Sequence, residues 1–235
     1  MSGKFLPLRI INQTNRQHNG TVIFFHGSGD TGEGASEYIK FLLRKDFQFP
    51  HLQVLFPTAP LRPYTPLDGE LSHVWFNRLS LSPDAPEHTE TLESVGRDVT
   101  SFIQHNIIKC GIPENRIIVG GFSMGGALAM HVGFRLMPKI AGVFALSSFL
   151  SHSSSIYKML QDMPRESINL PPLFMCHGDR DTLVSHEWGE ETFKMLTQLG
   201  VHGEFHTISN ALHELKRKEM LQLYEWITQK LPPST

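Results

Sequence analysis

Cysteine is almost absent from this sequence: only Cys110 and Cys176 occur among its 235 residues. Two cysteines cannot form the disulfide framework that stabilises small secreted domains. The opening stretch, "MSGKFL", does not resemble a secretory signal peptide. We therefore expect a cytosolic protein without structural disulfides.

Long apolar runs and blocks of like charge are also missing. No uninterrupted apolar run approaches the ~20 residues that a membrane span requires, and the formal net charge is −2. Glu214 and Glu219 interrupt the most basic stretch, "HELKRKEM" at 213–220. The chain lacks glycine at position 2 and a prenylation box in "KLPPST". We expect no nucleic-acid partner and at most transient membrane contact.

The apolar segments of the chain alternate between strand-like and helix-like patterns. Alternating strands and helices predict a mostly parallel central sheet with helices on both faces. The expected strands are 21–27, 52–60, 115–122, 139–148, 172–178 and 202–209. The expected helices are 34–45, 88–109, 124–136, 185–199 and 213–230. We predict a single domain over 1–235, with an N-terminal segment and strand to about residue 20 and a tail at 232–235.

One serine, Ser123, lies among four glycines in "VGGFSMGGALAM". Gly121 to Gly125 fits the pattern G-x-S-x-G, directly after a predicted buried strand and directly before a predicted helix. This context predicts a nucleophile elbow, a sharp turn that exposes the serine hydroxyl at the edge of an α/β-hydrolase sheet. An incidental serine in a glycine-rich turn is the competing interpretation.

A serine nucleophile needs a base and a group that orients the base, and in this fold they follow in the order Ser, Asp or Glu, His. Asp179 and Asp181 follow the strand expected at 172–178. His213 follows the strand expected at 202–209, at the start of a predicted helix. These positions predict that His213 and one of the two aspartates reach Ser123 at the carboxyl edge of the sheet.

Other histidines and a cysteine offer competing sites. His131 falls within the helix after the elbow, and His202 and His206 share one strand, so structural or exposed roles are favoured. A zinc site would need further ligands at suitable spacing, and we expect no metal. Cys176 lies inside an apolar strand, which favours a small buried hydrophobe over a thiol nucleophile.

Acyl transfer also requires hydrogen-bond donors for the oxyanion that forms on the carbonyl. One donor is the backbone N–H after the nucleophile, here that of Met124. The second comes from the loop after an earlier strand, and "FFHGSGDTGEG" at 24–34 offers the N–H of Ser28. An ordinary glycine-rich connection is the alternative for this loop.

Seven motifs together carry a family resemblance, in order along residues 20 to 231: "HGSGDTG", "PTAP", "WFN", "GGFSMGG", "ALSSFL", "CHGDRDTLV" and "LHEL". The sequence resembles the acyl-protein thioesterase and lysophospholipase family of α/β-hydrolases. The resemblance implies the α/β-hydrolase fold and no cofactor. It implies Ser123 as nucleophile, His213 as base and Asp181 as the orienting acid, with Ser28 and Met124 as oxyanion donors.

The chain departs from many thioesterases of the family in two places. Ser28 stands where they carry leucine in "HGLGD", and Met124 stands where they carry glutamine. Both act through the backbone, so we expect catalysis to survive and the acyl-chain preference to change. An N-terminal cysteine that family members can acylate is also missing, which disfavours stable residence on membranes.

The expected activity is hydrolysis of acyl esters or thioesters, including palmitoyl thioesters on proteins, with short acyl esters cleaved well. A small-ester carboxylesterase and a catalytically silent binding module are the alternatives. The expected partner is an S-acylated protein or a small acyl ester. Two long irregular segments, 57–87 and 149–171, carry the candidate acyl-binding residues Trp75, Phe76, Phe149 and Leu150, for which simple core packing is the alternative.

Overall fold

A twisted seven-stranded sheet forms the centre of the part of the chain that the computed structural model describes, residues 8–15, 18–164 and 169–233. Its strand order is β1-β3-β2-β6-β7-β8-β9. Within these residues β1 pairs antiparallel with β3, and every other adjacent pair in this sheet is parallel. The predicted mostly parallel sheet is confirmed.

The central strands are short apolar runs buried on both faces, which is why they lack polar alternation. All six strands predicted from the sequence form, most of them shorter by one to three residues and the one expected at 139–148 shorter by five, and a strand of the N-terminal segment precedes them. Their bounds are β1 (Leu8–Ile11), β2 (Gly20–Phe25), β3 (Leu52–Pro57), β6 (Ile117–Phe122), β7 (Gly142–Leu146), β8 (Leu173–Gly178) and β9 (Gly203–Ile208).

The five helices predicted from the sequence also form, and a sixth lies in the segment expected to be irregular. Two of them, α2 and α3, continue into π-helical turns at Gln104–Ile108 and Val132–Leu136. The α-helices are α1 (Gly32–Leu43), α2 (Thr89–Ile103), α3 (Met124–His131), α4 (Ser155–Asp162), α5 (His186–Gln198) and α6 (Arg217–Lys230).

One prediction about an irregular segment and one about the start of a helix need correction. Segment 57–87 contains a small hairpin of β4 (Leu61–Pro63) and β5 (Leu71–His73), joined through a 3₁₀ turn at Thr65–Leu67. A second 3₁₀ turn, Glu114–Arg116, precedes β6. The last helix begins at Arg217 rather than at 213, so His213 lies in the loop before it.

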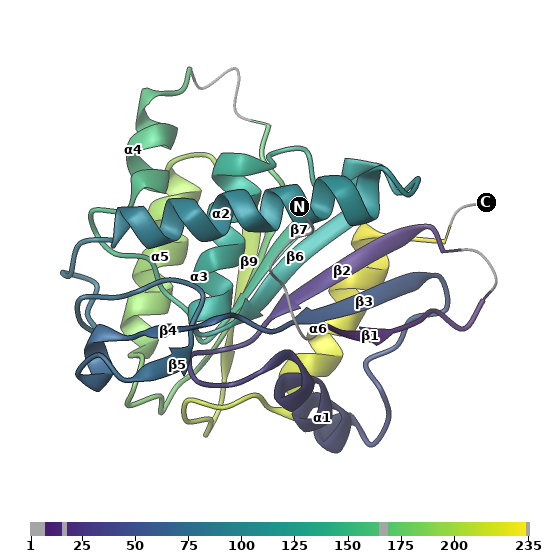
Figure 1. Cartoon of the computed structure of the whole chain (residues 1–235), viewed down its shortest axis with the longest axis horizontal. Coiled ribbons are helices and arrows are strands. Elements are labelled where there is room, and N and C mark those ends of the chain that lie inside the picture. The colour runs from purple at the N-terminus through teal and green to yellow at the C-terminus, as the bar shows by residue number, and fades with distance from the viewer. Residues whose placement is uncertain (1–7, 16–17, 165–168, 234–235) are drawn as a thin grey trace.

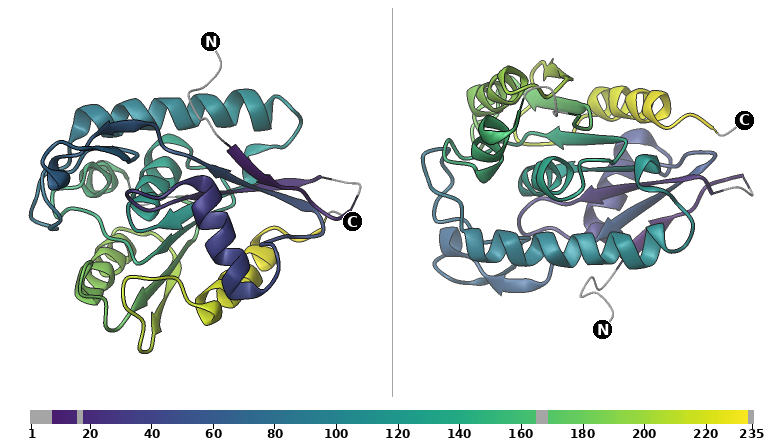
Figure 2. Two further views of the ribbon diagram at one scale, coloured as in Figure 1. Left: turned by 60° about the horizontal axis from the view of Figure 1, so that its bottom comes forward. Right: turned by 90° about the horizontal axis from the view of Figure 1, so that it is seen from above.

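Two hydrophobic cores lie on opposite faces of the sheet. The side chains of α1 and α6 pack against one face, with Ile39 and Trp226 among the buried residues. The side chains of α2, α3, α4 and α5 pack against the other, with Val95 and Leu128 among them. Figures 1 and 2 show these two groups of helices, and the β4–β5 hairpin standing apart from the main sheet. Among the described residues, every helix is too short or too polar to cross a bilayer.

A buried carboxyl on α6 holds the loop that precedes this helix. The Glu219 side chain is 1% exposed, and its Oε2 accepts a hydrogen bond of 3.0 Å from the backbone N–H of Lys216. No described residue donates to Oε1. Burial raises the pKa of Glu219 to about 8, so the folded protein retains a proton at neutral pH.

This buried proton makes stability depend on pH. The folded state binds it up to about pH 8, whereas an unfolded glutamate releases it near pH 4.3. Stability contributed by this group is therefore full below about pH 4.3, and it falls by up to about 1.4 kcal/mol per pH unit as the pH rises toward 8.

We expect Glu219→Gln to remove this pH dependence and to make the protein more stable than the wild type at pH 8. The measurement is urea unfolding of both proteins from pH 5 to 8, with the exposed Glu225→Gln on the same helix as a control for charge loss. A constant stability difference between Glu219→Gln and wild type across this range would contradict the prediction.

Candidate active site

The turn from β6 into α3 presents Ser123 in a strained backbone conformation. Its φ is +53° and its ψ −119°, a region that side-chain-bearing residues rarely adopt. A Cβ on Gly121 would lie 2.2 Å from the carbonyl oxygen of Phe25, and one on Gly125 would lie 2.1 Å from the same atom. The two glycines therefore let strand and helix approach closely enough to form the sharp turn predicted from G-x-S-x-G.

Hydrogen bonds join Ser123, His213 and Asp181 in one chain. The Ser123 Oγ lies 3.0 Å from His213 Nε2, and His213 Nδ1 lies 2.7 Å from Asp181 Oδ2. Asp181 follows β8, and His213 follows β9, the strand next to it. The carboxyl ends of three parallel strands thus bring together residues that are 90 and 32 positions apart.

The Asp181 carboxylate is fully enclosed, with a side chain that is 0% exposed. Its Oδ1 accepts hydrogen bonds from the backbone N–H groups of Leu183, at 3.0 Å, and Val184, at 2.9 Å. Burial by itself raises the pKa of Asp181, but hydrogen bonds from the His177 and His213 rings and from the backbone hold that pKa well below its usual range. The group therefore stays ionised opposite His213.

The second aspartate of the same loop has a different contact. Asp179 Oδ1 accepts a hydrogen bond of 2.7 Å from the backbone N–H of Asn210, a residue with φ +56°. This bond ties the loop after β8 to the loop after β9. Among the two candidates, the geometry brings Asp181 to His213 and leaves Asp179 in the turn.

The loop after β2 lies beside the start of α3. Gly29, at φ +81°, allows the loop to turn, and its N–H donates to the carbonyl of His73 at 3.0 Å. The Ser28 N–H has no acceptor among the described residues, and Met124 is the first residue of α3, where the helix provides no acceptor. The Ser28 Oγ lies 3.7 Å from Met124 Sδ. Two backbone donors are thus available, one on the loop after β2 and one at the first residue of α3.

Two buried residues hold the Ser28 loop from below, and the sequence analysis missed this role. His26 Nδ1 lies 2.6 Å from the carbonyl oxygen of Gly27, while its Nε2 accepts from the N–H of Ala59 at 3.0 Å. Burial lowers the pKa of His26, which favours this neutral ring. The Trp75 indole N–H donates to the carbonyl of His26 at 2.9 Å. The histidine that opens the "HGSGD" motif, His26, was the sequence signal that could have pointed to this supporting role.

An open cleft of about 490 Å³ lies above the Ser123 hydroxyl. This volume falls within the usual range for small-molecule sites. Apolar side chains from the β4–β5 hairpin, the loop after it and the turn after Asp181 form much of its wall. The lining residues are Gly27, Ser28, Gly29, Asp30, Tyr64, Pro66, Leu67, Ser72, Leu81, Phe122, Ser123, Leu183, Val184 and His213.

A second hollow of about 290 Å³ adjoins the cleft on the side of α1. Both hollows share Phe122 and His213 in their walls. The smaller one also contains the Tyr38 ring, which is 40% exposed, and the side chain of Glu214. The His213 ring therefore borders both hollows, whereas Ser123 borders only the larger one.

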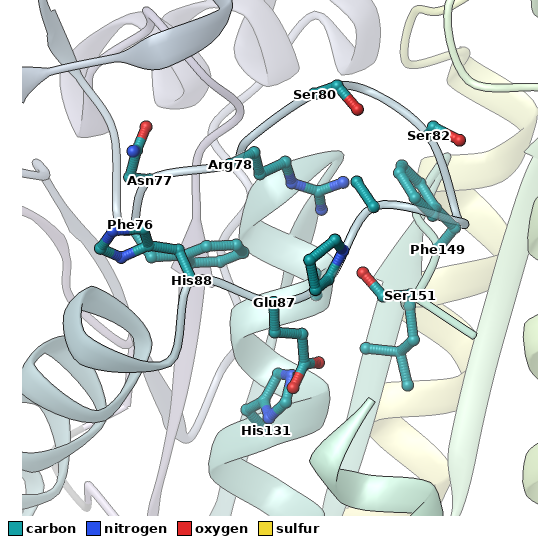
Figure 3. A pocket seen from close by; sticks show the side chains of 14 residues that line it. Phe76, Asn77, Arg78, Ser80, Ser82, Glu87, His88, His131, Phe149 and Ser151 are labelled. Atoms are coloured by element: carbon teal, nitrogen blue, oxygen red, sulfur yellow. The ribbon is translucent and has the colours of Figure 1, made fainter. Parts of the chain in front are cut away.

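The four residues proposed as an acyl-binding wall do not line the cleft. Trp75 is fully buried below the Ser28 loop. Phe76, Phe149 and Leu150 instead border a separate small cavity of about 20 Å³ around the Arg78 guanidinium (Figure 3). The prediction chose residues of the two long segments that are buried, whereas the cleft wall includes Leu67 and Leu183, which are about half exposed.

Hydrogen bonds in the wall of that cavity account for one competing histidine. His131 Nε2 lies 2.8 Å from Glu87 Oε1, and the Ser155 N–H donates to Glu87 Oε2 at 3.0 Å. Burial opposes ionisation of Glu87, but the His131 contact and the other hydrogen bonds outweigh it and lower its pKa to about 2. In Figure 3 the Glu87 side chain points toward His131 and away from Arg78. His131 is therefore a structural residue.

The remaining alternatives fall outside the site as well. His206 pairs with Glu204 on the exposed side of β9, at 2.9 Å. Burial raises the pKa of the Cys176 thiol, which lies within β8 and is 0% exposed. Across the residues described by the structure, no cluster of three or more His, Cys, Asp or Glu side chains could hold a metal ion.

The doubly covered parallel sheet and the serine at its strand-to-helix turn define an α/β-hydrolase. The chain belongs to the Phospholipase/Carboxylesterase family, whose family model matches residues 7–231. Lysophospholipase-like protein 1 of Mus musculus is 46% identical over 234 residues, which cover 100% of this chain and 96% of that protein. Membership makes the chain a serine hydrolase that acts on acyl esters.

Acyl-protein thioesterases are similar to this chain in both sequence and structure. Acyl-protein thioesterase 1 of Neurospora crassa is 31% identical over 221 residues, which cover 92% of this chain and 89% of that protein. The crystal structure of Zea mays acyl-protein thioesterase 2 superposes with a TM-score of 0.82 at 25% identity, covering 95% of this chain and 98% of that one. The family resemblance seen in the sequence is confirmed.

Proposed function

We propose that this protein hydrolyses acyl thioesters and oxygen esters through Ser123, His213 and Asp181, and that its substrates include palmitoyl thioesters on protein cysteines. The observation that carries the proposal is the unbroken hydrogen-bonded chain from the Ser123 hydroxyl to the buried Asp181 carboxylate, at the floor of an apolar cleft. The similarity to acyl-protein thioesterases supports the thioester substrate. We expect the protein to act in the cytosol, without a cofactor.

In the first half of the reaction, His213 Nε2 takes the proton of Ser123 as the Oγ attacks the acyl carbonyl. The carbonyl oxygen becomes an oxyanion, to which the N–H groups of Ser28 and Met124 donate. Asp181 keeps the His213 ring in the Nδ1–H tautomer and stabilises the imidazolium. The C–S or C–O bond then breaks, and His213 gives its proton to the departing thiol or alcohol.

In the second half, water replaces the leaving group. His213 removes a proton from this water, whose oxygen attacks the acyl carbon bound to Ser123. The acyl–Oγ bond breaks, the serine regains a proton from His213, and the free carboxylic acid departs. The larger, apolar cleft suits the acyl chain, and the smaller hollow beside Tyr38 and Glu214 suits the leaving group.

The proposal predicts covalent labelling of one serine. We expect a fluorophosphonate probe to label the wild type and not Ser123→Ala, with the variant losing several orders of magnitude in kcat. Labelling is read by intact-protein mass spectrometry, and circular dichroism checks that the variant is folded. A wild type that resists the probe would favour the alternative of a catalytically silent binding module.

Substituting the two aspartates separately tests which one orients the base. Asp181→Asn should lower kcat by about 10³ to 10⁴ with little change in KM, because the amide favours the wrong imidazole tautomer. Asp179→Asn should cost far less, since Asp179 contacts only the loop at Asn210 among the described residues. Steady-state kinetics on one soluble thioester compares them, and a greater loss in Asp179→Asn would reverse the assignment.

Acyl-chain length separates the thioesterase from the small-ester carboxylesterase. A fully buried methylene contributes about 0.8 kcal/mol, or about fourfold in kcat/KM, but Leu67 and Leu183 leave part of the cleft wall open to water. We therefore expect short acyl esters to be cleaved readily, and kcat/KM to rise less steeply than fourfold per methylene and to level off before sixteen carbons.

The measurement is a series of soluble thioesters of increasing length, each below its micelle concentration. Leu183→Ser should weaken the longer substrates and leave the two-carbon substrate unchanged. Leu212→Ser is the matched control, because Leu212 is 49% exposed and lies outside the cleft wall. A steady fourfold rise through sixteen carbons would reject the open cleft, and no activity beyond a few carbons would favour the carboxylesterase.

A further inference from the structure

A second histidine, in addition to His213, reaches the Asp181 carboxylate. His177 lies near the end of β8, and its side chain is 0% exposed. Its Nε2 lies 3.4 Å from Asp181 Oδ2, the same oxygen that His213 Nδ1 contacts at 2.7 Å. The mechanism above assigns His177 no part, although it is a buried titratable group in contact with the orienting carboxylate.

The contacts of His177 fix its tautomer. Its Nε2 lies 2.9 Å from the carbonyl oxygen of Val184, and because a carbonyl oxygen only accepts, the proton must be on Nε2. No described residue donates to or accepts from Nδ1. His177 is therefore held as the Nε2–H tautomer, the opposite of His213, whose Nε2 must be free to take a proton from Ser123.

These contacts clamp the turn that holds the carboxylate. Val184 accepts from His177 through its carbonyl and donates to Asp181 Oδ1 through its N–H, at 2.9 Å. One residue thus links the His177 ring to Oδ1, and the ring itself lies beside Oδ2. Both carboxylate oxygens are restrained by groups other than His213.

Helix α5 packs against the His177 ring. A Cβ on Gly189 would lie 2.2 Å from His177 Nδ1 and 2.9 Å from its Cε1, so the helix backbone packs directly on the imidazole. The His186 ring lies edge-on to it, with ring centroids 5.8 Å apart. The ring has no room to turn away from the Asp181 turn without moving α5.

We propose that His177 is a positioning residue for the reaction, which fixes the Asp181 carboxylate, and through it the His213 ring, in the orientation that the Ser123 hydroxyl requires. This inference rests on the proposed function of Ser123, His213 and Asp181. Misplacing a catalytic group by about 1 Å costs on the order of 100-fold in rate. Loss of the His177 clamp therefore lowers kcat more than it changes KM, because Val184 is part of the cleft wall but neither His177 nor Asp181 lines the cleft.

The test compares three variants with the wild type. His177→Leu removes the donor and should lower kcat about 10- to 100-fold with little change in KM. His177→Gln keeps an N–H that can reach the Val184 carbonyl, and should recover part of the loss. Gly189→Ala keeps the histidine but displaces its ring, and should reproduce the loss. Glu190→Ala, at an exposed position on the same helix, should match the wild type.

A second readout follows the His213–Asp181 hydrogen bond without turnover. The low-field proton resonance of the His213 Nδ1–H should weaken or move in His177→Leu and Gly189→Ala, and remain in Glu190→Ala. Circular dichroism confirms that each variant is folded. If His177→Leu does not fold, Gly189→Ala carries the test, because its histidine is intact.

Two results would overturn the inference: a wild-type kcat together with an unchanged low-field resonance, or a rise in KM with kcat unaffected. Failure of the proposed function looks different. In that case the fluorophosphonate probe would not label Ser123 in the wild type. The His213 Nδ1–H resonance would still report whether His177 positions the His213–Asp181 pair.

Discussion

The close approach of β6 and α3 to the end of β2 is the constraint on which the rest of the site depends. Gly121 and Gly125 both face the carbonyl oxygen of Phe25, where no Cβ can fit. This contact lets the chain reverse at Ser123 with a positive φ. The strained backbone of Ser123 costs free energy, and it persists because the buried sheet packed around it fixes the turn. The serine then stands at the start of α3, where unpaired N–H groups favour the negative charge of an oxyanion.

The substrate cleft depends on a different kind of constraint, the exposure of apolar side chains. Leu67 and Leu183 come from segments far apart in the chain, and both line the cleft while remaining about half exposed. Leaving such surface in water is unfavourable for folding by itself, and an acyl chain that covers it recovers that free energy. Hydrogen bonds hold the side chains of the proposed triad, whereas the walls of the cleft are short loops and a two-stranded hairpin.

Sequence reasoning could predict the fold and the residues of the proposed triad because both depend on local signals. Uninterrupted apolar runs indicate strands buried on two faces, and G-x-S-x-G between such a strand and a helix has few other structural uses. Placing Asp181 and His213 near Ser123 followed from one rule, that parallel strands bring their carboxyl ends to a common edge. The start of α6 was missed by a few residues because His213 and Glu214 continue the helical pattern of "HELKRKEM" without belonging to the helix.

The sequence by itself determined the parallel sheet, the elbow at Ser123 and the order of its partners, because strand burial, glycine conformation and chain order are properties of short segments. The residue pattern alone left Asp179 and Asp181 open, and the family resemblance favoured Asp181. The tertiary structure gives the physical difference, since the two aspartates share one loop but only Asp181 lies against His213, at 2.7 Å, while Asp179 bonds to Asn210. Only the tertiary structure decided that Trp75 supports the Ser28 loop while Leu67 and Leu183 line the cleft. Those roles depend on which long-range neighbours cover a side chain, and residue type alone does not specify them.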